Sequence, residues 1–226
     1  MNNYDAVLDF GSKNLRLGIF DKTSKNIYSS EKKITNSLEQ SLNFTIRDAE
    51  KSLSMHIDNI IVLFDSSKFY SLDISIKKDF DHEILINEVY NKLIEEAYFI
   101  VSQSNFKDQI IHLVVNEIIV DDNKKLDNII EDIKIKSLII EIKFICLSKI
   151  LIDEISNIFK KNNLKILNLY CSSYIKTIFH KKKLEDKNYF IFIDIGFKRT
   201  SGLIFKGNRL EYFKSISLGG NNITKD

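Results

Sequence analysis

Apolar and polar residues alternate in the first part of the chain, a pattern typical of strands with one buried face. Residues 4–9 form one such run, and residues 14–20 form a second, in which Leu15, Leu17 and Ile19 share a side. The tight turn between the two runs indicates a β-hairpin. Further along, the pattern predicts a third strand over 26–35, a helix over 47–56 and a short buried strand over 59–64.

The middle of the chain has a pattern of its own and predicts a separate α+β unit. Apolar residues such as Ile86, Val89 and Leu93 recur at steps of three and four, as on the buried side of an amphipathic helix. Ser148 is expected to cap a second helix. Helices are predicted over 81–102 and 148–161, strands over 69–77, 109–120, 137–147 and 164–169, and a loop or weak strand over 121–136.

The last part of the chain returns to short strands and turns. The apolar run 189–194 predicts a buried strand that ends in Asp-Ile-Gly. Gly207-Asn208 lies between two further apolar runs and predicts a second hairpin. Beside these, the pattern predicts a helix over 172–180, hairpin strands over 203–205 and 210–217, and a glycine turn that enters a helix over 219–224.

The composition fits a packed protein of one large domain or two small ones. The chain has 226 residues, and 44% of them are hydrophobic, which is enough for a core and argues against disorder. Charged residues make up 28%, but the formal net charge is only +2, so we expect no basic surface for nucleic acid. The longest basic run, His180–Lys183, is followed at once by Glu185 and Asp186, which indicates a solvated loop.

Cysteine usage and hydropathy favour a soluble cytosolic domain. Cys146 and Cys171 lie in or beside apolar stretches, so we expect two small core residues without a disulfide framework. The N-terminus lacks a basic region followed by an apolar run, so no signal peptide is predicted. No apolar run approaches the roughly 20 residues that a membrane-spanning helix needs.

The most informative feature of the sequence is a repeated Asp-x-Gly turn. Val7–Ser12 and Phe192–Phe197 each consist of an apolar strand that ends in Asp-x-Gly and then turns back into another strand. Glycine lets the backbone approach a ligand closely, and successive N–H groups in such a turn bind anions. A carboxylate just before the turn suits a hydrated Mg²⁺. Two such hairpins that face one another predict a clamp for the phosphates of a nucleotide, although a single Asp-x-Gly is most often only a hairpin corner.

These motifs, in this order, resemble the FtsA family of bacterial cell-division proteins. Val7–Arg16 is similar to the first phosphate motif of the actin, Hsp70 and sugar-kinase superfamily, and Phe192–Asp226 is similar to the second phosphate motif of FtsA. The resemblance implies an α/β protein with the actin-like ATPase (ribonuclease H-like) fold and an inserted α+β subdomain, the second half being incomplete. It divides the chain into 1–68 (subdomain 1A), 69–165 (the inserted, SHS2-like subdomain 1C) and 166–226 (the start of subdomain 2A).

The resemblance also implies a role for each matching residue. Asp9 and Asp194 face Mg²⁺ through waters, and Arg16 either reaches a phosphate oxygen or forms a surface ion pair. In the first turn, backbone N–H groups are expected to bind the phosphates of ATP. The glycines at 219 and 220 are expected to let the backbone approach the nucleotide closely. The implied phosphate-binding residues are Asp9, Gly11, Ser12, Lys13, Arg16, Asp194, Gly196, Thr200, Gly219 and Gly220.

An FtsA-like protein is expected to bind ATP, to polymerise and to link the FtsZ ring to the inner membrane. The family recruits later division proteins through the inserted subdomain and works at the cytoplasmic face of the inner membrane at the division site. The subdomain that docks FtsZ, the adenosine-binding glycines and the C-terminal amphipathic membrane helix would all lie beyond Asp226. We therefore expect the natural gene to continue past this point, because a truncated actin-like sheet would expose an apolar edge.

Three other hypotheses remain open. A PilM-like scaffold of a type IV pilus machine shares the inserted subdomain and a similar Gly-Gly-Asn turn. A sugar or acetate kinase needs a catalytic base, but His112 and His180 are better explained as structural residues, so at most a weak ATPase is expected. A degenerate, nucleotide-free scaffold is suggested by Phe197-Lys198-Arg199, where the family has small residues. A bulky residue forced into a positive φ would cost about 1–2 kcal/mol and reshape the turn, whereas Lys198 and Arg199 would add charge toward the phosphates.

Overall fold

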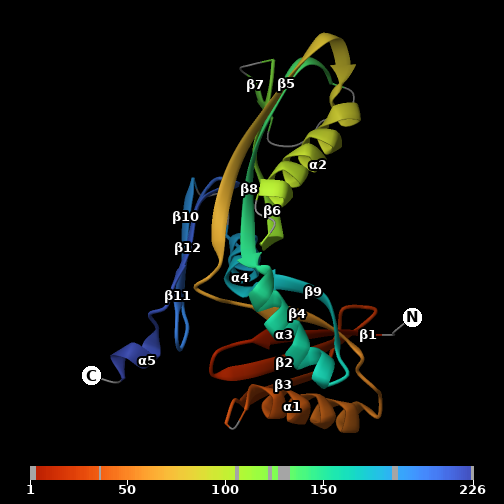
Figure 1. Ribbon diagram of the computed structural model, residues 1–226, viewed down its shortest axis with the longest axis vertical. Coiled ribbons are helices and arrows are strands. Elements are labelled where there is room, and N and C mark those ends of the chain that lie inside the picture. The colour runs from red at the N-terminus through yellow and green to blue at the C-terminus, as the bar shows by residue number, and fades with distance from the viewer. Residues whose placement is uncertain are drawn as a thin grey trace.

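The computed structural model describes residues 4–35, 37–104, 107–121, 124–126, 133–184 and 188–224, and it contains three sheets (Figure 1). The first sheet has five strands in the order β3-β2-β1-β4-β9. β1 is antiparallel to β2 and parallel to β4, which is in turn parallel to β9. These strands are β1 (Tyr4–Phe10), β2 (Asn14–Asp21), β3 (Asn26–Lys33), β4 (Asn59–Phe64) and β9 (Lys165–Cys171).

Two helices pack on the core of this sheet. α1 (Leu38–Leu53) contributes Leu42 and Ile46, and α3 (Lys149–Lys161) contributes Ile155 and Phe159, all of them buried. The first hairpin and the strand over 59–64 are thus confirmed, and Leu15, Leu17 and Ile19 do share the buried side.

The first helix is longer and earlier than predicted. α1 begins directly after Ser37, whose hydroxyl accepts a hydrogen bond from the Gln40 amide at 3.1 Å. It ends at Ser54, which has a left-handed φ of 52°, so 54–56 is not helical. The prediction over 47–56 missed the cap at Ser37. The serine expected to cap the later helix, Ser148, precedes α3, but its side chain makes no capping hydrogen bond.

The second sheet is antiparallel and has the order β5-β8-β6-β7, with α2 packed against it. In Figure 1 this unit extends away from the first sheet. Residues 81–85, predicted as the start of the helix, belong to β5 because Ile84 and Leu85 pair with Ile135 and Lys134. The elements are β5 (Tyr70–Leu85), α2 (Ile86–Ser104), β6 (Asp108–Val120), β7 (Lys124–Leu126) and β8 (Lys134–Ser148). Of the loop predicted over 121–136, residues 122–123 and 127–132 lie outside the described residues.

The third sheet has the order β10-β11-β12 and shares a core with the second. Leu203 and Phe205 pack with Ile145 and Leu147 of β8, and the predicted hairpin turn at Gly207 is confirmed, with a φ of 56°. The elements around this sheet are α4 (Ser172–Lys181), β10 (Tyr189–Ile195), β11 (Thr200–Lys206), β12 (Arg209–Ile216) and α5 (Gly220–Ile223). Residues 185–187, next to the basic run, lie outside the described residues.

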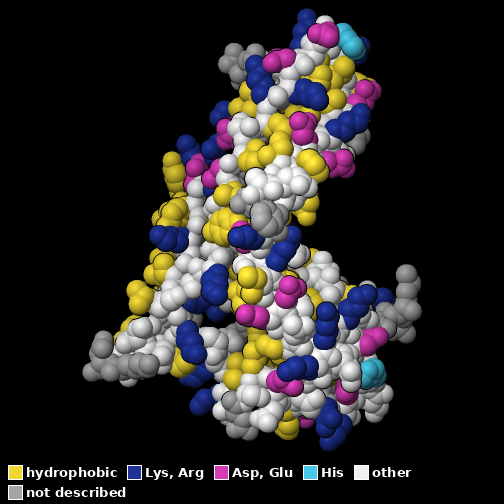
Figure 2. All heavy atoms as spheres, viewed as in Figure 1, with side chains coloured by type: hydrophobic (Ala, Val, Ile, Leu, Met, Phe, Trp, Pro, Cys, Tyr) yellow, Lys and Arg dark blue, Asp and Glu magenta, His cyan; other side chains and the backbone are white. Residues whose placement is uncertain are grey.

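The strand over 189–194 is not buried on both faces as predicted. Phe190 and Phe192 pack on the shared core, whereas Tyr189, Ile191 and Ile193 are exposed. Figure 2 shows apolar side chains along the side of the molecule where Figure 1 places β10. The apolar run therefore forms a strand, but only one of its faces is covered by described residues.

Elements from all three predicted ranges, 1–68, 69–165 and 166–226, contribute to the first sheet and its core, and the division itself stays a prediction. α3 packs on the core of the first sheet, and β9 pairs with β4, so both belong with the N-terminal unit.

Among the described residues, no helix has the length and apolar content to cross a membrane.

Candidate functional site

The site lies where the parallel strands of the first sheet end. Because β1, β4 and β9 are parallel, their carboxyl ends meet at one edge. Asp9 lies near the end of β1, and Asp65 directly follows β4. α4 begins after β9 with two buried serines: the Ser172 hydroxyl donates to Asp9 Oδ1 at 3.1 Å, and the Ser173 hydroxyl donates to Asp65 Oδ1 at 3.0 Å. The start of α4 is thus bound to both carboxylates.

The two Asp-x-Gly turns have the same construction. The Gly11 amide donates to the Asn14 carbonyl at 3.1 Å, and the Gly196 amide donates to the Arg199 carbonyl at 2.8 Å. A Cβ atom at Gly11 would lie 2.8 Å from the Asn14 oxygen, so glycine is required there for close approach. The strain expected at Phe197 is not present, because among the described non-glycine residues only Ser24, Ser54, Asp121 and Asn163 have a positive φ.

Both turns line a single cavity of about 250 Å³. The Lys13 ammonium lies 4.7 Å from the centre of the Phe197 ring, so a cation–π contact connects one turn to the other. Four cationic side chains and two carboxylates face the cavity, which gives its lining a net positive charge. The predicted residues that the structure brings together here are Asp9, Gly11, Ser12, Lys13, Arg16, Asp194 and Gly196.

Lys176 is a central residue of the site that the sequence analysis missed. Its ammonium lies 3.6 Å from Asp9 Oδ2 and 3.4 Å from Asp194 Oδ2, and so bridges the two hairpins. It comes from α4, one turn after Ser172, and residues four apart share a helix face. The spacing of Ser172 and Lys176 was the available signal, but it does not reveal which carboxylates that face meets.

Arg16 forms the ion pairs that were one of its two expected roles. Its guanidinium lies 3.3 Å from Asp9 Oδ2 and 3.0 Å from Glu31 Oε1. Partial burial tends to lower the pKa of Arg16, but the Glu31 and Asp9 carboxylates outweigh burial, so the pKa is raised. Asn14 also donates to Glu31, and this bond together with Arg16 lowers the pKa of Glu31. A phosphate contact of Arg16 stays a prediction.

The remaining predicted residues lie outside the described lining of this cavity. The Thr200 hydroxyl donates to the Leu218 carbonyl at 2.7 Å. The amides of Gly220 and Asn221 donate to the carbonyls of Gly196 and Phe197 at 2.9 and 2.8 Å. A Cβ atom at Gly219 would lie 2.5 Å from the Arg199 nitrogen. These residues therefore support the second turn through backbone hydrogen bonds and close packing. A direct phosphate contact for them remains a prediction.

Arg199 is held by a buried carboxylate. Its guanidinium lies 3.0 Å from Asp65 Oδ2 as an ion pair without a hydrogen bond, and the Asp65 side chain is almost completely buried. This contact ties the second turn to the end of β4. The charge of Arg199 borders the cavity, but it is already partly neutralised there.

The side chains present fit an anion better than a directly bound divalent cation. The carboxylates of Asp9 and Asp194 both contact the Lys176 ammonium, and Asp9 contacts Arg16 as well. Within the described part of the chain, no three His, Cys, Asp or Glu side chains come together as a metal site. The water-mediated Mg²⁺ expected at the two aspartates stays a prediction.

His112 and the two cysteines have structural surroundings. His112 Nε2 accepts a hydrogen bond from the Cys171 amide at 2.9 Å, and burial lowers the pKa of His112 to about 4. Cys146 and Cys171 are buried free thiols, and burial raises their pKa to about 11 and about 12. Neither residue type shows the features of an activated group, in agreement with the expected core roles.

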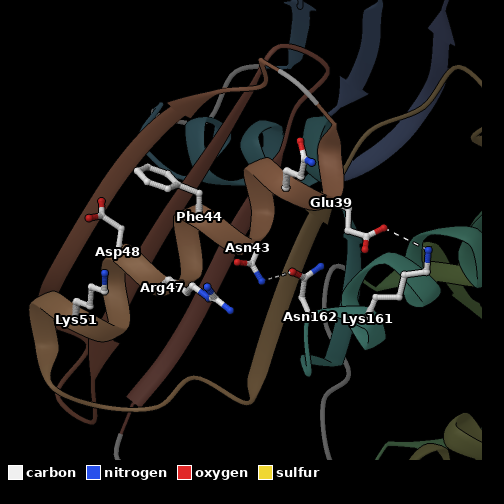
Figure 3. Close-up of a pocket in the computed structure, with 9 residues that line it drawn as sticks. Glu39, Asn43, Phe44, Arg47, Asp48, Lys51, Lys161 and Asn162 are labelled. Carbon is white, nitrogen blue, oxygen red and sulfur yellow. Dashed lines mark hydrogen bonds and ion pairs between the residues drawn. The ribbon is translucent and has the colours of Figure 1, made fainter.

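A larger cavity of about 430 Å³ lies between α1 and the end of α3 (Figure 3). Two pairs of polar groups connect the two helices across it: Glu39 with Lys161 at 3.3 Å, and Asn43 with Asn162 at 2.9 Å. Phe44 of α1 also borders it. These contacts are sufficient to explain it as the junction between two helices, so we place the functional site at the two turns.

Comparison with known proteins identifies the fold. No protein-family model matches the sequence, and no curated protein matches it. Among solved structures, a chain of the PilM-PilN type IV pilus biogenesis complex matches with a TM-score of 0.67 and 11% identity, over 98% of this chain. A Bacteroides thetaiotaomicron protein with an actin-like ATPase fold matches with a TM-score of 0.49 and 11% identity, covering 98% of this chain and 73% of that chain.

The match to the pilus protein shows an actin-like fold. This confirms the fold class expected from the sequence, including the α/β units around the two hairpins. The chain spans 63% of the length of the pilus protein. At 11% identity, the match shows the fold alone, and the resemblance to FtsA stays a prediction.

Proposed function

We propose that this chain is the phosphate-binding part of an actin-like scaffold protein that binds a nucleotide and holds partner proteins together, as a PilM-like adaptor. One observation carries the proposal: two Asp-x-Gly turns, separated by more than half of the chain, converge on one cation-lined cavity. A hairpin corner with only a structural role gives no reason for such convergence.

The donors in the cavity are those that phosphate oxygens require. Lys13 and Arg16 supply charge, and charge-assisted hydrogen bonds are the strongest kind. Among the described residues, the amides of Ser12 and Lys13 donate to no other protein group, so both are available to an anion. The volume of about 250 Å³ is below the roughly 300–1,000 Å³ of pockets that enclose a whole ligand. We therefore assign the cavity to the phosphates of a nucleotide such as ATP.

We propose binding with slow turnover at most. A general base must be free to take a proton from the attacking group. Asp9 and Asp194, the carboxylates that face the cavity, are both engaged by cations. The nucleotide then governs assembly of the scaffold, including polymerisation, more than it serves as a substrate.

The structural match favours a pilus-type partner over a division-type partner. The chain that it matches belongs to a PilM-PilN complex, so we propose a partner protein of the PilN kind, bound at the cytoplasmic face of the inner membrane. The second candidate is an FtsA-like adaptor for FtsZ and later division proteins, in which the inserted unit is the docking surface. Exposed Tyr98, Phe99 and Ile100 on α2 give that unit an apolar surface for a partner.

Calorimetry of ATP binding to the full chain tests the proposed site. Lys13→Ala removes a cation from the cavity and is expected to weaken binding by about tenfold, since hydrogen bonds to charged groups contribute about 1.5–3 kcal/mol. Lys22→Ala, an exposed lysine in the turn after β2, is the matched control and should leave binding unchanged. Failure of the wild-type chain to bind ATP, or equal effects of the two variants, would contradict the proposal.

Purified partners separate the two scaffold types. The chain is titrated with the cytoplasmic segment of a PilN protein and, separately, with FtsZ from the same organism. Binding of the PilN segment alone supports the pilus-type adaptor. Binding of FtsZ alone would favour the division-type adaptor.

A further inference from the structure

We propose that Lys176 takes the place of a divalent cation between Asp9 and Asp194, so that the cavity binds a phosphate chain without a metal. The inference rests on the proposed function, because it concerns how the same cavity receives phosphates. It makes Lys176 a specificity-determining residue of the site.

The position of the ammonium is the first argument. It lies 3.6 Å from Asp9 Oδ2 and 3.4 Å from Asp194 Oδ2, between the carboxylates that the two hairpins present. A lysine ammonium has three N–H donors, and one of them donates to Asp194, so donors are left for a ligand oxygen. The side chain is 36% exposed and borders the cavity, so a ligand has access to it.

The anchoring of α4 is the second argument. Ser172, one turn before Lys176, donates to Asp9, and Ser173 donates to the buried Asp65. Thr177 donates back to the Ser173 carbonyl at 2.6 Å within the helix. The ammonium is therefore delivered by an element whose start is fixed to the first sheet, which distinguishes it from a lysine on a solvent-exposed loop.

The charge balance is the third argument. A divalent cation at the aspartates would lie beside an ammonium of the same sign, in a site partly shielded from water, where repulsion is stronger than in bulk solvent. Of the four cationic side chains of the cavity, Arg16 and Arg199 also pair with Glu31 and Asp65, so Lys13 and Lys176 supply the positive charge that phosphates need.

The test is calorimetry with inorganic triphosphate, performed once with excess EDTA and once with excess Mg²⁺. The wild-type chain is expected to bind in EDTA at least as tightly as in Mg²⁺. Lys176→Met keeps the apolar length of the side chain and should lose about tenfold in affinity in EDTA, the loss of one charge-assisted contact. The control is Lys181→Met on the same helix, whose ammonium donates to Asn208 at 2.7 Å outside the cavity, and which should bind like the wild type.

Each outcome is decisive. Tighter binding of the wild type in Mg²⁺ than in EDTA, or wild-type affinity of Lys176→Met in EDTA, overturns the inference and leaves the proposed function standing. Binding in neither condition overturns both. A second measurement does not depend on any variant: Mn²⁺ titration followed by electron paramagnetic resonance should detect no protein-bound Mn²⁺ in the wild-type chain. A bound Mn²⁺ that is released when Asp194 is replaced by Asn would overturn the inference.

Discussion

His112 shows how a single side chain is fixed by its surroundings. It lies beside a bulge of β6 at Ile111, where the strand register shifts, and bulges re-aim the neighbouring side chains. Its ring contacts those of Tyr170 and Tyr174, with centroids 5.6 and 4.5 Å away. Nε2 accepts the Cys171 amide, which requires that nitrogen to carry no proton. The residue therefore connects β6 to the end of β9 in its neutral form.

This arrangement predicts a loss of stability in mild acid. The pKa of His112 falls from 6.5 to about 4 on folding because burial disfavours the charged ring. The unfolded chain therefore takes up a proton first, and the free energy of unfolding decreases as the pH falls from 6.5 to 4. The contribution is roughly 3 kcal/mol. Urea unfolding between pH 7 and pH 4 measures it. The His112→Gln variant should lack this part of the pH dependence, and an identical pH profile for both proteins would contradict the assignment.

β10 has one buried face and one exposed apolar face. Among the described strands it pairs only with β11 at the edge of its sheet, and its side chains alternate between the shared core and solvent. Phe190 and Phe192 face the core, whereas Ile191, Ile193 and Ile195 form an exposed apolar row. Such a row on an edge strand favours pairing with another chain. Only one face of β10 is therefore buried by the described residues.

Two alanine substitutions on paired strands test this one-sided burial. Ile193 is 62% exposed, so Ile193→Ala is expected to cost less than about 1 kcal/mol of unfolding free energy. Leu203 of β11 is completely buried, so Leu203→Ala is expected to cost about 2–5 kcal/mol. Denaturant unfolding at low protein concentration gives both values. Equal costs would mean that the exposed face is covered in solution.

At the scale of the whole molecule, the third sheet is docked onto the second by polar contacts as well as by the shared core. Asn116 lies at a second bulge of β6, and its side chain binds the outer edge of β12: Oδ1 accepts from the Leu210 amide at 2.9 Å, and Nδ2 donates to the Leu210 carbonyl at 3.2 Å. Arg209 pairs with Glu117 and Glu141 at 3.0 and 2.8 Å. These contacts position β12 and the rest of the third sheet, which supplies the second Asp-x-Gly turn at one side of the cavity.

Removal of the Asn116 side chain is therefore expected to loosen this docking. Asn116→Ala leaves the buried Leu210 amide and carbonyl without these partners, at a cost of about 1–3 kcal/mol. Hydrogen exchange of the Leu210 amide should accelerate by the same free energy. Asn91→Ala on the exposed side of α2 is the control and should change stability by less than about 0.5 kcal/mol. Unchanged exchange at Leu210 in Asn116→Ala would contradict the docking role.

The sequence by itself determined the local parts of this protein. The first hairpin, the strand over 59–64 and the turn at Gly207 follow from alternation and turn chemistry, which involve residues close in the chain. The similarity of the two Asp-x-Gly turns was also visible, because each turn is closed by a hydrogen bond between residues three apart.

Only the tertiary structure decided which of these parts meet. Lys176 contacts Asp9 and Asp194 because α4 follows β9, and β9 lies next to β4 in the sheet order. The covered face of β10 and the pairing of Arg199 with Asp65 likewise depend on packing between distant segments. A local pattern specifies the period of an element and its turns, but the partner of a side chain is set by sheet order and by the cores that the sheets share.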